Sequence, residues 1–92
     1  MFFSSDEVNQ ILGLINWNNL DKDQLNFKGV SIDSRTLLSE DLFVAIEGNN
    51  FDGHNFLEEV SNKNIKAVVI SKRYINLVPN NCAYWAVTDT LW

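Results

Sequence analysis

Two short apolar runs constrain the fold of this chain more than any other feature of its sequence. The runs lie in Leu42–Ile46 (LFVAI) and Lys66–Ile70 (KAVVI), the second being apolar from Ala67 onward. They are too short for helices, and consecutive apolar residues are typical of strands buried on both faces. The segment between them, from about Asn55 to Lys63, has helical spacing. A strand, a helix and a strand within about 30 residues predict a βαβ unit with parallel strands and a right-handed crossover.

The sequence also indicates how this unit is built. Asn55 is expected to cap the helix at its N-terminus, and Asn64 follows the helix at a position that favours a left-handed backbone. The helix residues expected to face the sheet are Phe56, Leu57 and Val60. The strand residues expected to be buried are Phe43, Ala45, Val68 and Ile70.

Further elements flank the unit. Ser4 and Glu7 form a predicted capping box for a helix over Ser5–Ile15, whose apolar stripe is Val8, Ile11, Leu12 and Ile15. Strands are predicted over Phe27–Ile32 and Ala83–Val87, while 16–26 is a loop with room for one short strand and 71–81 is a connection. The predicted fold is one α/β layered domain over 1–92, with a mostly parallel or mixed sheet of four or five strands and flanking helices.

Charge and composition exclude several classes of function. The net charge is −5 with only seven Lys and Arg, so we expect no nucleic-acid partner. The single Cys82 cannot form an internal disulfide, which fits a reduced compartment. The N-terminus lacks a basic signal-peptide region, and no apolar run approaches the roughly 18 residues that span a bilayer. We therefore expect a cytoplasmic protein without membrane insertion.

A search for catalytic motifs finds none. The sequence has no GxxxxGK[ST], GxGxxG, HExxH or GxSxG pattern, and a lone His54 and a lone Cys82 cannot form a metal site by spacing. His54 lies in a predicted turn, where a structural role is expected. We therefore predict no catalytic residue and no metal ligand in this chain.

Two loops remain as candidate binding segments, because each follows a predicted buried strand and open α/β sheets bind ligands at the carboxyl ends of strands. Asp33–Thr36 offers a carboxylate, two hydroxyls and a guanidinium, and Gly48–Phe51 offers two amides and an aromatic ring after a glycine. Both segments also have a purely structural interpretation. In that interpretation Asp33 accepts N–H groups of its turn and pairs with Arg35, and the second loop is a polar turn.

The same segments carry a family resemblance. GVSIDSRTL at 29–37, DLFVAIEG at 41–48 and FDGHNF at 51–56, in this order, resemble the N-terminal domain of the Mur ligases. The resemblance covers about residues 27–91. The chain departs from the family pattern in two turns: Ser39–Glu40 stand where the family usually has Pro-Gly, and Asn64 stands where it usually has Gly.

The resemblance implies a function for this domain, which is to hold the uridine end of a UDP-MurNAc-peptide. The residues that it implies at the uridine are Ile32, Ser34, Asn49, Asn50 and Phe51, with Asp33, Arg35, Thr36 and His54 as possible supporting residues. In the family, ATP and Mg²⁺ bind a central domain and the incoming amine binds a C-terminal domain. Both domains are then partners outside this chain, so we expect it to hold no cofactor and to be inactive alone.

Within the family, the pattern is most similar to the ligases that add D-alanyl-D-alanine to UDP-MurNAc-tripeptide during peptidoglycan precursor synthesis. Two alternatives remain open. One is the sister ligase that adds the third amino acid to UDP-MurNAc-dipeptide. The other is a stand-alone α/β module that binds a different nucleotide or a protein.

Overall fold

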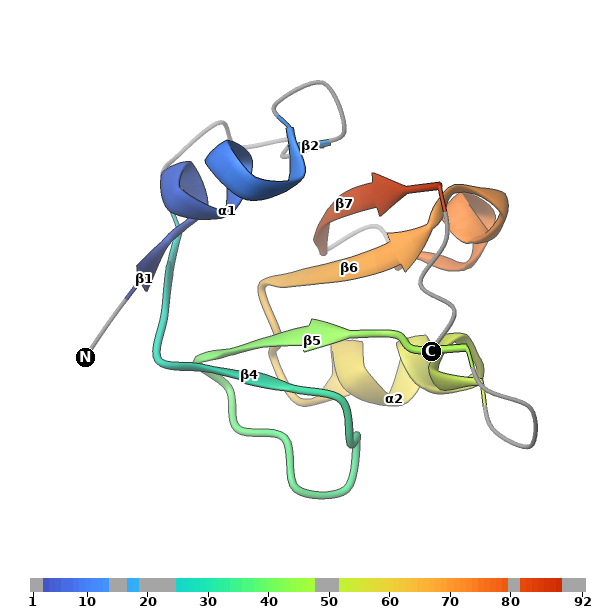
Figure 1. Cartoon of the computed structure of the whole chain (residues 1–92). Coiled ribbons are helices and arrows are strands. Elements are labelled where there is room, and N and C mark those ends of the chain that lie inside the picture. Colours follow the sequence, from blue (N-terminus) through green and yellow to red (C-terminus); the bar gives the residue numbers. More distant parts are fainter. Residues whose placement is uncertain (1–2, 14–16, 19–24, 48–51, 80–81, 89–92) are drawn as a thin grey trace.

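A computed structural model describes residues 3–13, 17–18, 25–47, 52–79 and 82–88. Its main feature is a five-stranded sheet with the strand order β2-β7-β6-β5-β4 (Figure 1). The strands are β2 (Trp17–Asn18), β4 (Gly29–Ser31), β5 (Asp41–Val44), β6 (Ala67–Ser71) and β7 (Ala83–Val87). The pairs β4–β5, β5–β6 and β6–β7 are parallel, whereas β2 is antiparallel to β7. The predicted fold class is confirmed.

A second, two-stranded antiparallel sheet lies beside the first. It pairs β1 (Phe3–Ser4) with β3 (Asn26–Phe27). Phe27 is buried, and its ring contacts Phe3 and Trp85 at centroid distances of 5.4 Å and 6.2 Å. This small sheet therefore joins the N-terminal segment to the core.

The predicted βαβ unit is confirmed. After β5 the chain forms a 3₁₀ turn, η2 (Gly53–Phe56), then helix α2 (Leu57–Asn62), and returns as β6 in parallel register with Phe43 opposite Val68. The four residues predicted to be buried here, Phe43, Ala45, Val68 and Ile70, are all inaccessible to solvent. Ala45 lies just beyond β5, but its N–H still donates to Val69 at 2.9 Å.

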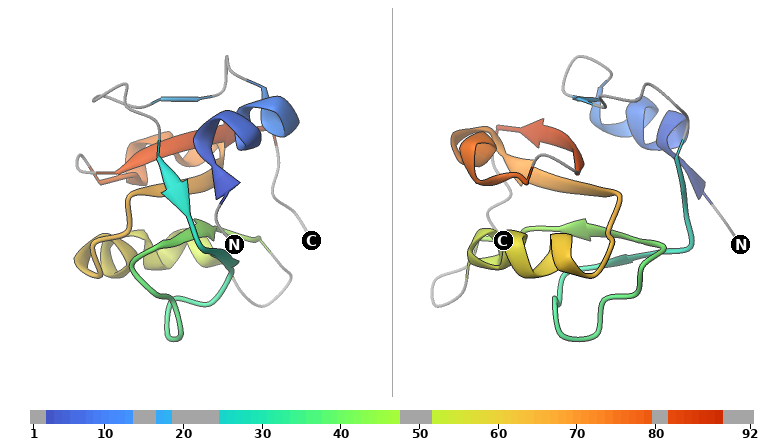
Figure 2. Two further views of the ribbon diagram at one scale, coloured as in Figure 1. Left: turned by 90° about the vertical axis from the view of Figure 1, so that its left-hand side faces the viewer. Right: turned by 180° about the vertical axis from the view of Figure 1, so that it is seen from behind.

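The central strand β6 divides the interior into two cores. Val68 and Ile70 pack with Leu57 and Val60 of α2, whereas Ala67 and Val69 pack on the opposite face, in the cluster that holds Val8 of α1 (Ser5–Leu12), Phe27 and Trp85. The two helices therefore cover opposite faces of the sheet (Figure 2). Alternation of side chains along a strand produces this division, since successive residues point to opposite faces.

Helix α1 begins as predicted but ends early, and of its predicted apolar stripe Val8 and Leu12 pack on the core. The capping box is present, with Glu7 N–H donating to the Ser4 hydroxyl at 3.3 Å and Ser4 N–H to Glu7 at 3.2 Å. The helix ends at Leu12 because Gly13, with φ of 93°, turns the chain. Ile15 lies outside the described residues.

The inward stripe of α1 was predicted wrongly at Ile11, whose side chain is 82% exposed. The face that meets the sheet contains Ser5, Val8 and Asn9, and Asn9 Oδ1 accepts a hydrogen bond from Trp85 Nε1 at 2.7 Å. A polar residue thus occupies a position on the inward face, because the indole N–H of a buried tryptophan requires an acceptor.

The strand predicted over Phe27–Ile32 is two strands. The chain changes sheets at Lys28, so that β3 pairs with β1 and β4 pairs with β5. Val30 of β4 and Ile32 just after it are 59% and 52% exposed, because β4 is the edge strand of the five-stranded sheet. The next strand also differs slightly, since β5 spans Asp41–Val44 rather than 42–46.

Of two predictions for the ends of the second helix, one was wrong and one is confirmed, and the connection 71–81 differs from the prediction. Asn55 does not cap the second helix; Asp52 accepts the His54 N–H at 2.9 Å and starts a 3₁₀ turn that leads into α2. Asn64 has the expected left-handed backbone, with φ of 61°. The connection 71–81 contains a 3₁₀ helix that the sequence did not indicate, η3 (Lys72–Leu77).

We predict that Gly53→Ala destabilises the chain. A Cβ atom at Gly53 would lie 3.0 Å from both Ala45 Cα and Ile46 N, so the main chain after β5 would have to move. Overpacking of this kind costs about 1–3 kcal/mol of unfolding free energy, measurable by urea denaturation.

Gly29→Ala is the matched control, because the added Cβ would meet side-chain atoms of Asp41 rather than main-chain atoms. Equal destabilisation by the two substitutions would contradict the close main-chain approach at Gly53.

Candidate functional site

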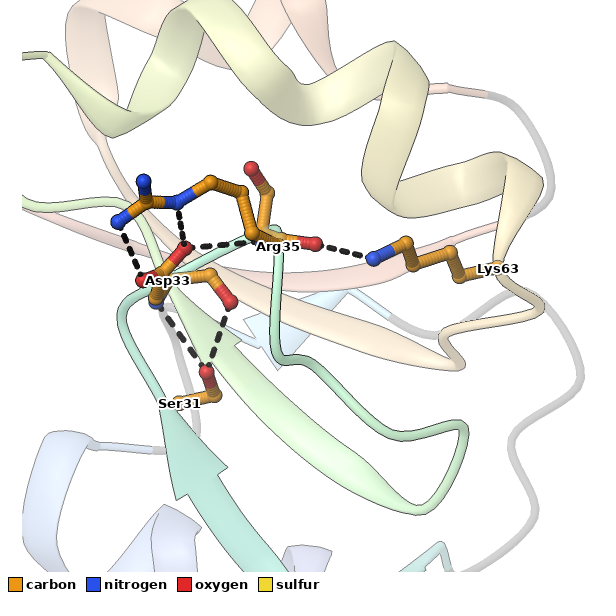
Figure 3. Close-up of polar contacts among 5 residues, drawn as sticks. Ser31, Asp33, Arg35 and Lys63 are labelled. Carbon is orange, nitrogen blue, oxygen red and sulfur yellow. Dashed lines mark hydrogen bonds and ion pairs between the residues drawn. The ribbon is translucent and has the colours of Figure 1, made fainter.

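The candidate site lies where the chain leaves β4. Because β4 and β5 are parallel, the segments that follow them start from the same edge of the sheet. The first of these segments, residues 32–40, crosses back to the start of β5 and begins with the turn Asp33–Thr36 (Figure 3). We call residues 31–36 the DSR turn.

Side chains hold the DSR turn from within. The Ser31 hydroxyl accepts the Asp33 N–H at 3.2 Å and donates to the Asp33 carbonyl oxygen at 3.1 Å (Figure 3). The Asp33 carboxylate then accepts the Arg35 N–H at 2.8 Å. This last contact is an Asx turn, in which a carboxylate replaces a main-chain acceptor.

Asp33 and Arg35 also form a bidentate ion pair. Arg35 Nε lies 3.1 Å from Asp33 Oδ1, and an Arg35 terminal nitrogen lies 3.0 Å from Oδ2. The side-chain hydrogen bond from Arg35, with a further contribution from its N–H, lowers the pKa of Asp33, and the pair raises the pKa of Arg35. The structural interpretation of these two residues is therefore confirmed, and Arg35 remains largely exposed.

The DSR turn forms one wall of a surface recess of about 460 Å³. The residues that line it are Ile32, Asp33, Ser34, Arg35, Phe56 and Glu59. Ser34 is only 5% exposed, and Ile32 forms an apolar part of the wall. Four of the predicted site residues are thus brought together, whereas Thr36 is exposed and does not line the recess.

Sequence reasoning missed the opposite wall of the recess. Phe56 and Glu59 come from η2 and α2, and Lys63, which follows the helix, donates to the Ser34 carbonyl oxygen (Figure 3). The three residues are spaced i, i+3 and i+7, which places them on one helical face. That spacing indicated a shared helical face, but it does not show which other segment of the chain packs against this face.

His54 lies away from this recess, in a buried network. Its Nδ1 is 2.6 Å from Asp52 Oδ1, its Nε2 accepts the Ser71 N–H at 3.1 Å, and its ring stacks on Tyr74 at a centroid distance of 4.0 Å. Because Nε2 is an acceptor, the proton of the neutral ring belongs on Nδ1. The expected structural role of His54 is confirmed.

The same network fixes Asp52. Burial raises the pKa of the Asp52 carboxyl, but hydrogen bonds from the main chain and ring of His54 and from the Tyr74 hydroxyl outweigh it, so the pKa is lowered. Asp52 also pairs with Glu47 through a β-bridge, and Glu47 forms an ion pair with Arg73. Asn49, Asn50 and Phe51, the other predicted uridine residues, lie outside the described residues.

The described residues include no group of three or more His, Cys, Asp and Glu that could hold a metal ion. Burial raises the pKa of the Cys82 thiol, which donates to the Ile65 carbonyl oxygen at 3.2 Å, so Cys82 is a poor nucleophile. No helix within the described ranges is long and apolar enough to cross a membrane.

A family model described as "Mur ligase family, catalytic domain" matches residues 26–86, more than half of the chain. This chain belongs to the Mur ligase family. The matched segment runs from β3 into β7 and contains the DSR turn, the recess and the His54 network.

Individual relatives agree with the family assignment. The UDP-N-acetylmuramoyl-tripeptide--D-alanyl-D-alanine ligase of Treponema pallidum is 46% identical over 48 residues, which are 52% of this chain and 10% of that protein. The UDP-N-acetylmuramoyl-L-alanyl-D-glutamate--2,6-diaminopimelate ligase of Rickettsia felis is 36% identical over 59 residues, which are 64% of this chain and 11% of that protein. The chain thus spans about a tenth of the length of these relatives.

A solved structure shows the same fold. A crystal structure of MurF from Acinetobacter baumannii superposes with a TM-score of 0.77 and 26% sequence identity, covering 98% of this chain and 19% of that one. The match therefore extends beyond the 26–86 segment of the family model to nearly all of the chain.

We predict that Arg35→Gln raises the pKa of Asp33 toward its ordinary value, because the substitution removes the largest cause of the lowered pKa. A lowered pKa means that the interaction stabilises the fold above the unfolded-state pKa of about 3.9, and that this contribution is lost as pH falls through the folded-state pKa. Carbon-detected NMR titration of the Asp33 carboxyl measures the shift.

Lys66→Gln serves as the control for loss of one positive charge, since Lys66 is exposed and precedes β6. An Asp33 midpoint that is the same in wild type and Arg35→Gln would contradict the ion pair as its cause.

Proposed function

We propose that this chain is the domain of a Mur ligase that holds the uridine end of a UDP-MurNAc-peptide. The observation that carries the proposal is the recess at the DSR turn, where Ile32, Asp33, Ser34 and Arg35 meet the face of α2. It lies at the carboxyl end of a parallel strand, the position at which open α/β sheets bind nucleotides.

The recess suits a nucleoside better than a highly charged group. Asp33 and Arg35 neutralise each other, and Glu59 adds a negative charge at the wall. Phe56 and Ile32 provide apolar surface for a flat base, and the Ser34 hydroxyl provides a donor or acceptor. A ring packed on this surface and hydrogen-bonded to Ser34 is the arrangement that we propose for uridine.

In this proposal the domain contributes to catalysis by positioning. Anchoring the distant uridine holds the peptide carboxylate where another domain can activate it, which lowers the entropic part of the barrier. The sequence has no phosphate-loop motif, and the described residues hold no acidic cluster for Mg²⁺. We therefore assign ATP, Mg²⁺ and the chemical steps of ligation to domains outside this chain, in a cytoplasmic enzyme.

We propose further that the complete enzyme adds D-alanyl-D-alanine to UDP-MurNAc-tripeptide. The SIDSRTL and FDGHNF segments and the Treponema pallidum relative support this assignment, whereas the Rickettsia felis relative supports the sister ligase that adds the third amino acid. Uridine is common to both substrates, so this recess does not distinguish them. The test is the acceptor that the complete enzyme uses, D-alanyl-D-alanine or a diamino acid.

We predict that Ser34→Ala weakens binding of UDP-MurNAc-tripeptide to the 92-residue chain, because the substitution removes one hydrogen bond in a buried position. The expected loss is about 1–3 kcal/mol, or about five- to 150-fold in Kd, measured by isothermal titration calorimetry.

Ser39→Ala is the matched control, because Ser39 is exposed on the same crossover segment. UDP should compete with the full substrate for the wild-type chain. Equal affinity of the Ser34 and Ser39 variants would contradict the proposed site, and failure of UDP to compete would assign the contact to another part of the ligand.

A further inference from the structure

One peptide unit of the DSR turn is held at both ends by charged side chains. The unit joins Ser34 to Arg35. Its N–H donates to the Asp33 carboxylate at 2.8 Å, and its carbonyl oxygen accepts from the Lys63 ammonium (Figure 3). An anion at the positive end and a cation at the negative end of a peptide dipole both resist rotation of the peptide plane, since hydrogen bonds to charged groups are the stronger ones.

The preceding peptide unit is also held. It joins Asp33 to Ser34, and its carbonyl oxygen accepts from the Ser31 hydroxyl at 3.1 Å. The two units meet at the Ser34 Cα atom, so their orientations set both backbone dihedrals of Ser34. Those dihedrals set the direction of its Cα–Cβ bond and hence the position of the Ser34 hydroxyl in the wall of the recess.

Lys63 is the one member of this arrangement that is distant in sequence, 29 residues from Ser34. It is the C-cap residue of α2, where a cation is favoured by the exposed carbonyl groups of the last turn. Its side chain is partly buried and reaches across from the helix to the turn (Figure 3). This contact links the end of the helix to the DSR turn.

We propose that Lys63 is a positioning residue for the uridine site: without touching the ligand, it orients the Ser34 hydroxyl by holding the Ser34 carbonyl group. This inference rests on the proposed function. It predicts that Lys63 affects ligand affinity only through Ser34.

The experiment measures binding of UDP-MurNAc-tripeptide, UDP and uridine to the 92-residue chain by calorimetry. We expect Lys63→Met to weaken all three by the same factor, about five- to thirtyfold, because it removes the partner of a partly buried carbonyl group. Lys63→Arg should restore affinity to within about threefold, since guanidinium also donates. Lys66→Met, at an exposed lysine beyond α2, should bind as wild type.

A double-mutant cycle gives the decisive readout. If Lys63 acts through Ser34, then Lys63→Met has no further effect in a chain that already carries Ser34→Ala. Additive losses would overturn the proposal, as would a loss confined to UDP and UDP-MurNAc-tripeptide, which would indicate direct contact of Lys63 with phosphate.

The outcomes separate the inference from the function on which it rests. If Ser34→Ala weakens binding but Lys63→Met does not, Lys63 is not a positioning residue and the uridine site stands. If the wild-type chain binds none of the three ligands, the proposed function itself fails. Amide NMR spectra of each variant show that the fold is retained, and Lys63→Met should shift the Arg35 amide signal while Lys66→Met leaves it in place.

Discussion

Burial of β6 on both faces is the constraint on which the rest of this structure depends. All five residues from Ala67 to Ser71 are buried, so other elements must pack on both faces of the strand. Helix α2 packs on one face and α1 on the other. The main-chain groups of β6 form hydrogen bonds with β5 on one side and β7 on the other. The crossover segment that carries the DSR turn returns the chain to β5, the parallel neighbour of β6, so the site is a consequence of how this one strand is enclosed.

The local sequence predicts those parts of the fold in which one strong signal acts alone. The apolar run of β6, the capping box of α1 and the left-handed Asn64 were each predictable because a single physical preference decides the conformation. Predictions failed where contact with a residue distant in sequence determines which side chains are buried. Ile11 matched the helical period but is exposed, whereas Asn9 lies on the inward face and accepts the hydrogen bond of the Trp85 indole.

The candidate site divides in the same way. The Asx turn and the Asp33–Arg35 pair span two residues, so spacing alone indicated them. Phe56 and Glu59 line the recess, and Lys63 reaches the DSR turn, only because the sheet order brings the face of α2 beside the end of β4. No local sequence pattern specifies that arrangement. The resemblance to the Mur ligases compensated in part, because it named Ile32 and Ser34, but it gave no information on Lys63.

The crossover from β4 to β5 has a consequence for how a ligand would bind. Parallel strands usually need a connection of about a dozen residues, often a helix. Here residues 32–40 suffice, and they are tied along their length: Leu37 is buried in the core, and Leu38 exchanges hydrogen bonds with Asp41. A turn already ordered by folding is preorganised, and a ligand that docks on it bears little of the entropic cost of ordering a loop. Its on-rate would then be set by diffusion and orientation, and not by a conformational step at this turn.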